Sequence, residues 1–119
     1  MAKDGAGVYV SHFSDGGMQF EIGYARGMLN GRMRRWAQNG QLILDCSYTD
    51  DVKEGRSKRW HENGILAEDA FYVDDKLEGE YAQYDERGNP ILKAKFKDGQ
   101  LVKDSARTGQ EPEGEEKKS

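Results

Sequence analysis

The sequence has few of the residues that cross-link a chain or anchor it in a membrane. It contains one cysteine, Cys46, and two prolines among 119 residues, so no disulfide can form within the chain. No apolar stretch approaches the roughly 20 residues that a membrane-spanning helix needs. The N-terminal letters MAKDGAG lack the apolar core of a signal peptide. We therefore expect a cytoplasmic protein, although a leader removed beforehand would leave the same appearance.

Apolar side chains are also scarce. Hydrophobic residues make up 35% of the chain and charged residues 34%, and the mean hydropathy is −0.97. A thick two-layer interior is hard to fill from this supply, so the composition favours a thin architecture. Fifteen glycines indicate many turns, provided that they are regularly spaced.

The net charge of −4 argues against a nucleic-acid partner, because such proteins must neutralise phosphates. The charge is also uneven along the chain. Residues 26–36 contain four arginines and no acid, whereas residues 67–86 contain eight acids and one base, which gives −7. A chain with this asymmetry can attract a charged partner or another copy of itself.

The dominant pattern is an internal repeat, and a fixed period decides the fold class when it is present. Two glycine columns and two largely aromatic columns recur in register, at a constant spacing of 24 residues, as between Gly7 and Gly31. They are Gly7, Gly31, Gly55 and Gly79; Gly16, Gly40, Gly64 and Gly88; Tyr24, Tyr48, Tyr72 and Phe96; His12, Trp36, Trp60 and Tyr84. We therefore predict a repeat domain over residues 7–102, with units 7–30, 31–54, 55–78 and 79–102. Residues 1–6 form a leader, and residues 103–119 are expected to be a disordered charged tail.

Each unit reads as a β-hairpin. After its second glycine the chain alternates with period two, as in Leu42, Leu44, Cys46 and Tyr48, which is typical of a half-buried strand. Asp-Gly or Asn-Gly precedes that strand in the first three units, and both dipeptides favour tight hairpins. A second turn, at residues 26–30, 50–54 and 74–78, leads to the next unit. The chain is thus predicted to be all-β, a single twisted antiparallel sheet of four tandem hairpins stacked like a solenoid.

The register of the Asn-Gly turn has two alternatives. A two-residue loop pairs Trp36 with Ile43, whereas a three-residue loop with a left-handed Gly40 pairs Trp36 with Leu42. We favour the second, because it places Trp36, Trp60 and Tyr84 on the apolar face, where large rings bury most area. Pro90 has no amide hydrogen to donate, so it suits an edge strand or a strand start.

The letters GRSKRWHENGILAEDAFYVDDKLEG, residues 55–79, resemble the MORN-repeat variant of bacterial proteins of the YwqK-type antitoxin family. The shared features are an aromatic residue, an acidic-Asn-Gly turn, an alternating strand that ends in tyrosine, a turn and the next glycine. The resemblance implies a curved sheet of hairpins that acts as an interaction module. The antitoxin family implies a protein partner that is neutralised.

The chain offers little catalytic chemistry. His12 and His61 lie in adjacent columns, and with Cys46 they make no metal-binding spacing. We expect structural or surface roles for both histidines and a place in the core for Cys46. The Gly-rich turns lack the Walker pattern and no helix follows them. The sequence therefore predicts no catalytic residues, no cofactor and no metal, and a protein that is not an enzyme.

The strand before each turn carries the candidate binding residues, because bases and rings share one strand face there. Arginine beside an indole is frequent at binding hot spots. The alternative is that the stems of the bases cover the rings and keep the sheet soluble. Arg35 and Arg59 fall on the other face and are expected to be surface charges. The predicted partner-binding residues are Arg32, Arg34, Trp36, Arg56, Lys58, Trp60 and Tyr84.

These patterns favour a protein-binding scaffold of the antitoxin or immunity-factor kind, whose partner is a toxin or another protein. A module that binds anionic lipid head groups is one alternative, since each base near such a surface is worth about 1 kcal/mol. A self-assembling structural protein is the other, because the basic front of one copy can meet the acidic back of the next.

Overall fold

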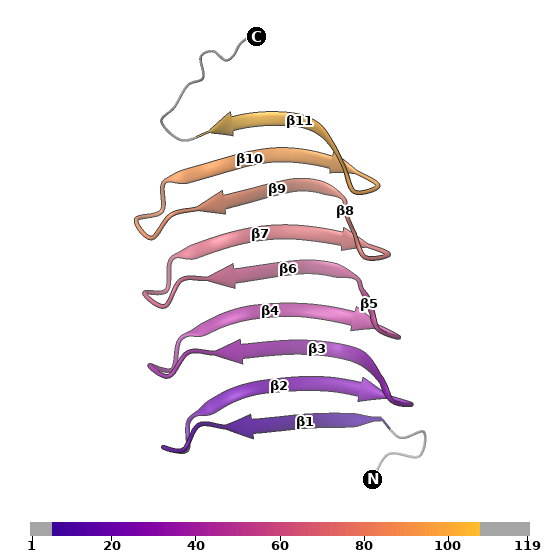
Figure 1. Cartoon of the computed structure of the whole chain (residues 1–119), viewed down its shortest axis with the longest axis vertical. Coiled ribbons are helices and arrows are strands. Elements are labelled where there is room, and N and C mark those ends of the chain that lie inside the picture. The colour runs from indigo at the N-terminus through magenta and orange to yellow at the C-terminus, as the bar shows by residue number, and fades with distance from the viewer. Residues whose placement is uncertain (1–5, 108–119) are drawn as a thin grey trace.

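The computed structural model describes residues 6–107, and every regular element in this range is a β-strand. Figure 1 shows the strands stacked side by side in one layer, with hairpin turns along both edges. The sheet measures 58 × 34 × 13 Å, which leaves no room for a second layer about 10 Å away. The strands are β1 (Gly7–His12), β2 (Met18–Ala25), β3 (Met28–Trp36), β4 (Leu42–Thr49), β5 (Val52–Lys53), β6 (Gly55–Trp60), β7 (Leu66–Val73), β8 (Lys76–Leu77), β9 (Gly79–Tyr84), β10 (Pro90–Lys97) and β11 (Gln100–Arg107).

All pairs are antiparallel, and the sheet is open, with the order β1-β2-β3-β4-β6-β7-β9-β10-β11. The short strands β5 and β8 pair with β4 and β7, and each leads directly into the next long strand. Every strand therefore touches only its neighbours along the chain, as a solenoid requires. The predicted fold class is confirmed.

One edge of the sheet carries the Asn-Gly turns, and their register is the expected one. Gly40 has a φ of 91°, and its N–H donates to the Ala37 carbonyl at 2.9 Å, while the Ala37 N–H donates to the Gln41 carbonyl at 2.8 Å. Trp36 consequently pairs with Leu42. The other three units repeat both bonds, including the unit in which Pro90 is the first residue of β10.

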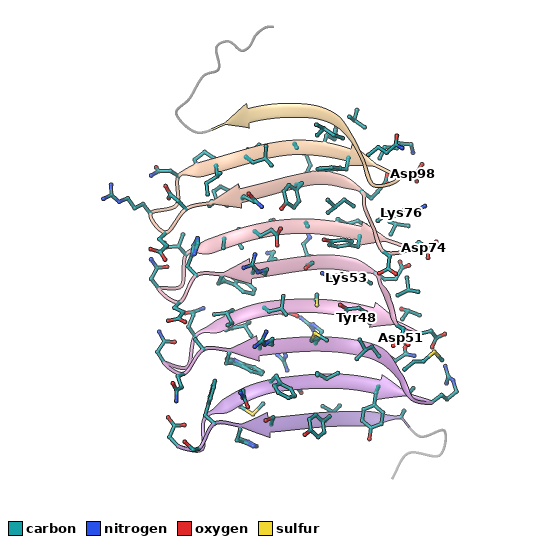
Figure 2. The ribbon with its side chains drawn as sticks, in the orientation of Figure 1. Tyr48, Asp51, Lys53, Asp74, Lys76 and Asp98 are labelled. Atoms are coloured by element: carbon teal, nitrogen blue, oxygen red, sulfur yellow. The ribbon has the colours of Figure 1, made fainter. Side chains whose placement is uncertain are left out.

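The opposite edge carries tight two-residue turns that bind the units to one another. Asp74 and Asp75 have φ values of 55° and 69°, as a type I′ turn requires, and aspartate tolerates this region better than most residues. The Asp75 N–H donates to the Lys53 carbonyl at 3.0 Å, and an Asp75 carboxylate oxygen accepts from the Lys53 N–H at 2.9 Å. Figure 2 shows the turn residues Asp51, Asp74 and Asp98 following one another along this edge.

A β-bulge in each hairpin decides which side chains share a face. Between Arg35 and Trp36 the pairing shifts by one residue, so that Arg35 pairs with Leu44 and Arg34 with Asp45. Cross-strand partners project from the same face, so alternation along β3 places Trp36 with Arg34 on the face of Asp45. The prediction that the Trp36, Trp60 and Tyr84 column lies on the apolar face is therefore wrong. The extra residue in β4 reverses the alternation between Leu42 and the rest of that strand.

The most buried residues form a row across the middle of the opposite face, which we call the core face. Cys46, Ser57, Ala70 and Ala94 are 2%, 4%, 2% and 1% exposed, and the strand register aligns them. Larger rings flank the row, among them Tyr81, which lies edge-on to the ring of a neighbouring strand. The expected place of Cys46 in the core is confirmed. In a one-layer sheet, small side chains are buried only because long neighbours fold over them.

The ends of the array differ from the predicted boundaries at one point. β11 runs to Arg107, so the expectation of a disordered tail from residue 103 is wrong for residues 103–107. The strand continues because its backbone pairs with β10 as far as Leu92. The rest of the predicted tail, residues 108–119, and residues 1–5 of the predicted leader lie outside the described residues.

Candidate binding surface

The seven residues predicted to bind a partner all project from one face of the sheet, which we call the charged face. Arg32, Arg34 and Trp36 come from β3, Arg56, Lys58 and Trp60 from β6, and Tyr84 from β9. They come together because β3, β6 and β9 are the first strands of consecutive hairpins and have the same register within them.

The charges on this face alternate in sign across the sheet. Glu21 pairs with Arg34, and Arg34 pairs with Asp45. Asp45 then pairs with Lys58, and Lys58 pairs with Asp69. Opposite charges on directly paired positions stabilise a sheet, and like charges there destabilise it. The bases that the sequence indicated as a positive cluster are thus interleaved with acids.

Three of the arginines make ion pairs with these acids. Arg34 Nη2 lies 2.6 Å from Glu21 Oε1, and Arg56 Nη1 lies 3.3 Å from Asp69 Oδ1. Arg32 binds Asp45 through two nitrogens, at 2.9 and 3.0 Å. This hydrogen bonding, together with the charge of Asp45, raises the pKa of Arg32 above its ordinary value. Charge-assisted hydrogen bonds of this kind hold the guanidinium groups beside the acids.

The rings lie beside these bases near the Asn-Gly edge. The guanidinium carbon of Arg34 is 5.5 Å from the centroid of the Trp36 ring, and the ammonium of Lys93 is 5.8 Å from that of Tyr84. Both distances fall within the range of a cation–π contact. Trp36, Trp60 and Tyr84 are each partly exposed. The rings of Trp36 and Tyr84 therefore each contact a base of the chain itself, while part of every one of the three rings faces solvent.

Arg34 shows that the two roles considered for these bases can coincide. Its guanidinium contacts both Glu21 and Trp36, which matches the covering role. The same contacts prearrange a ring and a charge beside each other, as binding hot spots require. The use of all seven residues in binding stays a prediction.

Among the shallow hollows of the charged face, two lie along β6 and β9. The first has a volume of about 300 Å³ and is lined by Arg32, Asp45, Ser47, Arg56 and Lys58. The second, of about 410 Å³, lies over Ala82 and is lined by Phe71 and Tyr84 together with charged residues of both signs. Phe71 is 40% exposed. Both hollows could receive a side chain of a partner.

Sequence reasoning missed the acids and the second hollow. Glu21, Asp45 and Asp69 occupy equivalent positions of consecutive repeats, so the same alignment of repeats contains the signal. Uninterrupted alternation along residues 42–48 would put Asp45 on the face opposite the tryptophans, and the bulge reverses this. Ala82 stands one repeat after Lys58, and this loss of a base was the available sign of the hollow.

The remaining candidate residues have structural surroundings. The ring nitrogen Nε2 of His61 lies 2.9 Å from the Tyr84 carbonyl of the next unit, and His12 is exposed at the end of β1. Burial raises the pKa of the Cys46 thiol. Arg59 forms an ion pair with Glu68 at 3.4 Å on the core face. Within residues 6–107, no group of three His, Cys, Asp or Glu side chains could hold a metal ion.

Comparison with known proteins identifies one unit of this array. Residues 53–74 match the family model described as the MORN repeat variant, and they run from β5 through the Asn-Gly turn to the end of β7. The other hairpins share the turn bonds of this unit, so the sheet has the form of MORN-type hairpin repeats. MORN repeats are generally linked to binding, for example to membranes or proteins. No curated protein matches the chain, and no helix in the described part is long and apolar enough to cross a bilayer.

Proposed function

We propose that the chain is a non-enzymatic scaffold that binds a protein partner through its charged face. The observation that carries this proposal is a one-layer sheet, 13 Å thick, with a row of partly exposed rings on one face. Each ring lies in a repeat of the same geometry, so the rings form an extended surface. Extended surfaces built from repeats are well suited to binding macromolecules.

The fixed ion pairs support binding by lowering its entropic cost. Arginine carries about 2 kcal/mol of rotamer entropy in solution. Because Asp45 holds Arg32 through two hydrogen bonds, less of that entropy is lost when a partner contacts the same guanidinium. Such prearranged polar groups around partly exposed rings are the usual composition of an interface.

The finer proposal is that the partner is a toxin-like protein, as the resemblance to antitoxin proteins implies. We propose a cytoplasmic location with it. A partner neutralised by capture would need only a complementary surface, and the scaffold would need no reactive group.

Affinity capture from the native lysate, followed by mass spectrometry, tests the binding surface. The double variant Trp36→Ala, Trp60→Ala should lose the partner while its circular dichroism remains that of the wild type. Arg35→Ala, Arg59→Ala is the matched control, because it removes two exposed side chains from the core face. If the double variant of the charged face folds and retains every captured protein, this surface is wrong. If it fails to fold, the two single variants replace it.

Self-association is a second candidate function, and the edge strand β1 favours it. Val8, Tyr9 and Val10 are 57%, 58% and 40% exposed, and no strand pairs with the outer edge of β1 within residues 6–107. Uncharged edges of this kind tend to pair with another strand. Light scattering across salt and protein concentrations tests it, and a strict monomer at low salt and high concentration would rule it out.

Binding to anionic lipid receives less support. Arg32, Arg34 and Arg56, which motivated it, each have an acid within 3.3 Å. Cosedimentation with anionic vesicles at physiological salt distinguishes this candidate, since a lipid-binding module pellets above the level seen with neutral vesicles.

A further inference from the structure

The fourth unit lacks a side chain that the two units before it possess. Arg34, Lys58 and Ala82 occupy the same position of β3, β6 and β9 in consecutive repeats. Each pairs across the sheet with an acid of the preceding strand, namely Glu21, Asp45 and Asp69. Only Ala82 has no long side chain to lie over this position. The structure has a hollow of about 410 Å³ there.

Part of the lining of the hollow is apolar. Ala82, Phe71 and Tyr84 contribute to this part. Phe71 is 40% exposed, and its equivalents in the earlier units are Gly23 and Ser47. Of these three equivalent positions, only that of Phe71 carries a ring, and Phe71 lies on the strand that pairs with the strand of Ala82. An exposed ring beside an apolar depression is typical of a site where a partner inserts a side chain.

Two basic side chains also contribute to the lining of the hollow. Arg56 and Lys93 both line it. Lys93 already lies 5.8 Å from the centroid of the Tyr84 ring, so its ammonium is positioned to contact a ring. Arg56 is held by Asp69 at 3.3 Å, yet 60% of its side chain is exposed. The acids Asp69, Glu78 and Glu80 line the hollow as well. Among these charged groups, the cations of Arg56 and Lys93 are the ones that can bind the electron-rich face of an aromatic ring.

We propose that the hollow over Ala82 receives an aromatic side chain of the protein partner. The ring would pack on Ala82 between Phe71 and Tyr84, with its faces toward Arg56 and Lys93. It would occupy the space that Arg34 and Lys58 fill in their own units. This inference rests on the proposed binding function and names the chemistry that the partner must present.

Titration of the full chain with N-acetyl-tryptophan amide tests the inference. The Ala82 methyl signal in a carbon–proton NMR spectrum should shift upfield and saturate at millimolar amide, whereas the methyl of Ala25, in the first unit, should not move. The leucine and arginine amides should produce smaller shifts at equal concentration. An arginine amide that shifts the Ala82 signal as strongly as the tryptophan amide would overturn the proposal, as would no shift from any amide.

Matched variants sharpen the test. Ala82→Lys restores the residue type of unit three and should weaken binding of the tryptophan amide at least tenfold, read from the Tyr84 ring signals. Arg34→Ala should open an equivalent space beside Trp36 and add a second shifting site. Unchanged binding to the Ala82→Lys variant contradicts the inference.

Capture of the partner separates this inference from the proposed function. If Ala82→Lys captures the partner as the wild type does, while Trp36→Ala, Trp60→Ala does not, the charged face binds without the hollow and the inference is wrong. If the amide binds over Ala82 but no partner depends on the charged face, the proposed function is wrong and the ring site stands.

Discussion

Asn63 links two consecutive units, and its replacement by aspartate isolates one hydrogen bond between them. Its Oδ1 accepts from the Ile65 N–H at 2.9 Å and closes its own turn. Its Nδ2 donates to the Glu86 carbonyl of the next unit, also at 2.9 Å. Asn63→Asp keeps the first bond and replaces the donor of the second by a carboxylate oxygen that faces a carbonyl oxygen. A hydrogen bond contributes about 0.5–1.5 kcal/mol net, so we expect destabilisation of about 1 kcal/mol.

The first unit allows the reverse substitution, from aspartate to asparagine. Asp15 occupies the position of Asn63 and closes its own turn through the Gly17 N–H at 2.9 Å. The carbonyl equivalent to that of Glu86 is that of Gln38. Asp15→Asn should provide the missing donor and stabilise the protein by up to about 1 kcal/mol.

Urea unfolding at neutral pH, followed by circular dichroism, measures both changes. From the most to the least stable, we expect the order Asp15→Asn, wild type, Asn63→Asp and Asn63→Ala. The last variant loses both bonds. Equal midpoints for Asn63→Asp and the wild type, together with a loss in Asn63→Ala, would show that only the turn bond matters. That result would refute the role of these amides in joining the units.

Three further outcomes follow from the burial of particular groups. Ala70→Leu should destabilise the sheet by about 1–3 kcal/mol, because it enlarges a side chain that is 2% exposed in the buried row of the core face. Ala82→Leu, on the charged face, should cost less than about 0.5 kcal/mol in the same urea assay, near the usual limit for surface changes. Burial and the hydrogen bond to Glu68 raise the pKa of Tyr81 to about 12. The folded state thus disfavours the phenolate, so the neutral phenol contributes fully to the stability of the fold below pH 10, and this stability is lost as the pH rises toward 12. Tyr81→Phe should therefore lose less stability than the wild type between pH 10 and 12. Cys46 should react with a thiol reagent only as fast as the sheet opens, because its side chain is 2% exposed and its pKa is raised. Labelling in native buffer at the rate of free cysteine would contradict this.

The period and the turns of this fold could be predicted from sequence because local chemistry determines them. The Asn39-Gly40 pair predicts a tight turn, because Gly40 can take the left-handed position that the structure shows. The pair left two loop lengths open, and the structure has the three-residue loop. The same reasoning places strands between the turns, since alternation of apolar and polar residues over about eight positions predicts a strand from local sequence alone. Pro90 also followed the rule that proline suits the start of a strand.

The assignment of faces could not be predicted with the same reasoning. The faces depend on the position of the β-bulge in the strand pairing. The sequence does not indicate that Arg35 pairs with Leu44 rather than with Ile43. One shifted residue moved Arg34 from the apolar face to the face of Asp45. The predicted binding residues remain together because they lie on one strand face in either register.

The hollow over Ala82 shows a different limit. Its volume depends on a missing base at position 82 and on a ring at Phe71, which come from adjacent strands, β9 and β7. Each residue is unremarkable in its own repeat, and only the paired register of β7 with β9 brings them together. Such sites become visible when repeats are compared position by position across the sheet.

The central claim, that the charged face binds a protein partner, is tested most directly by hydroxyl-radical footprinting of the captured complex. The oxidation rates of Trp36, Trp60 and Tyr84 should fall several-fold when the partner is bound, because an interface excludes water from their exposed parts. Tyr24, which is 40% exposed on the core face, should react at the same rate in the free and bound protein. Protection of Tyr24 with unchanged rates at both tryptophans would place the partner on the other face and contradict this account.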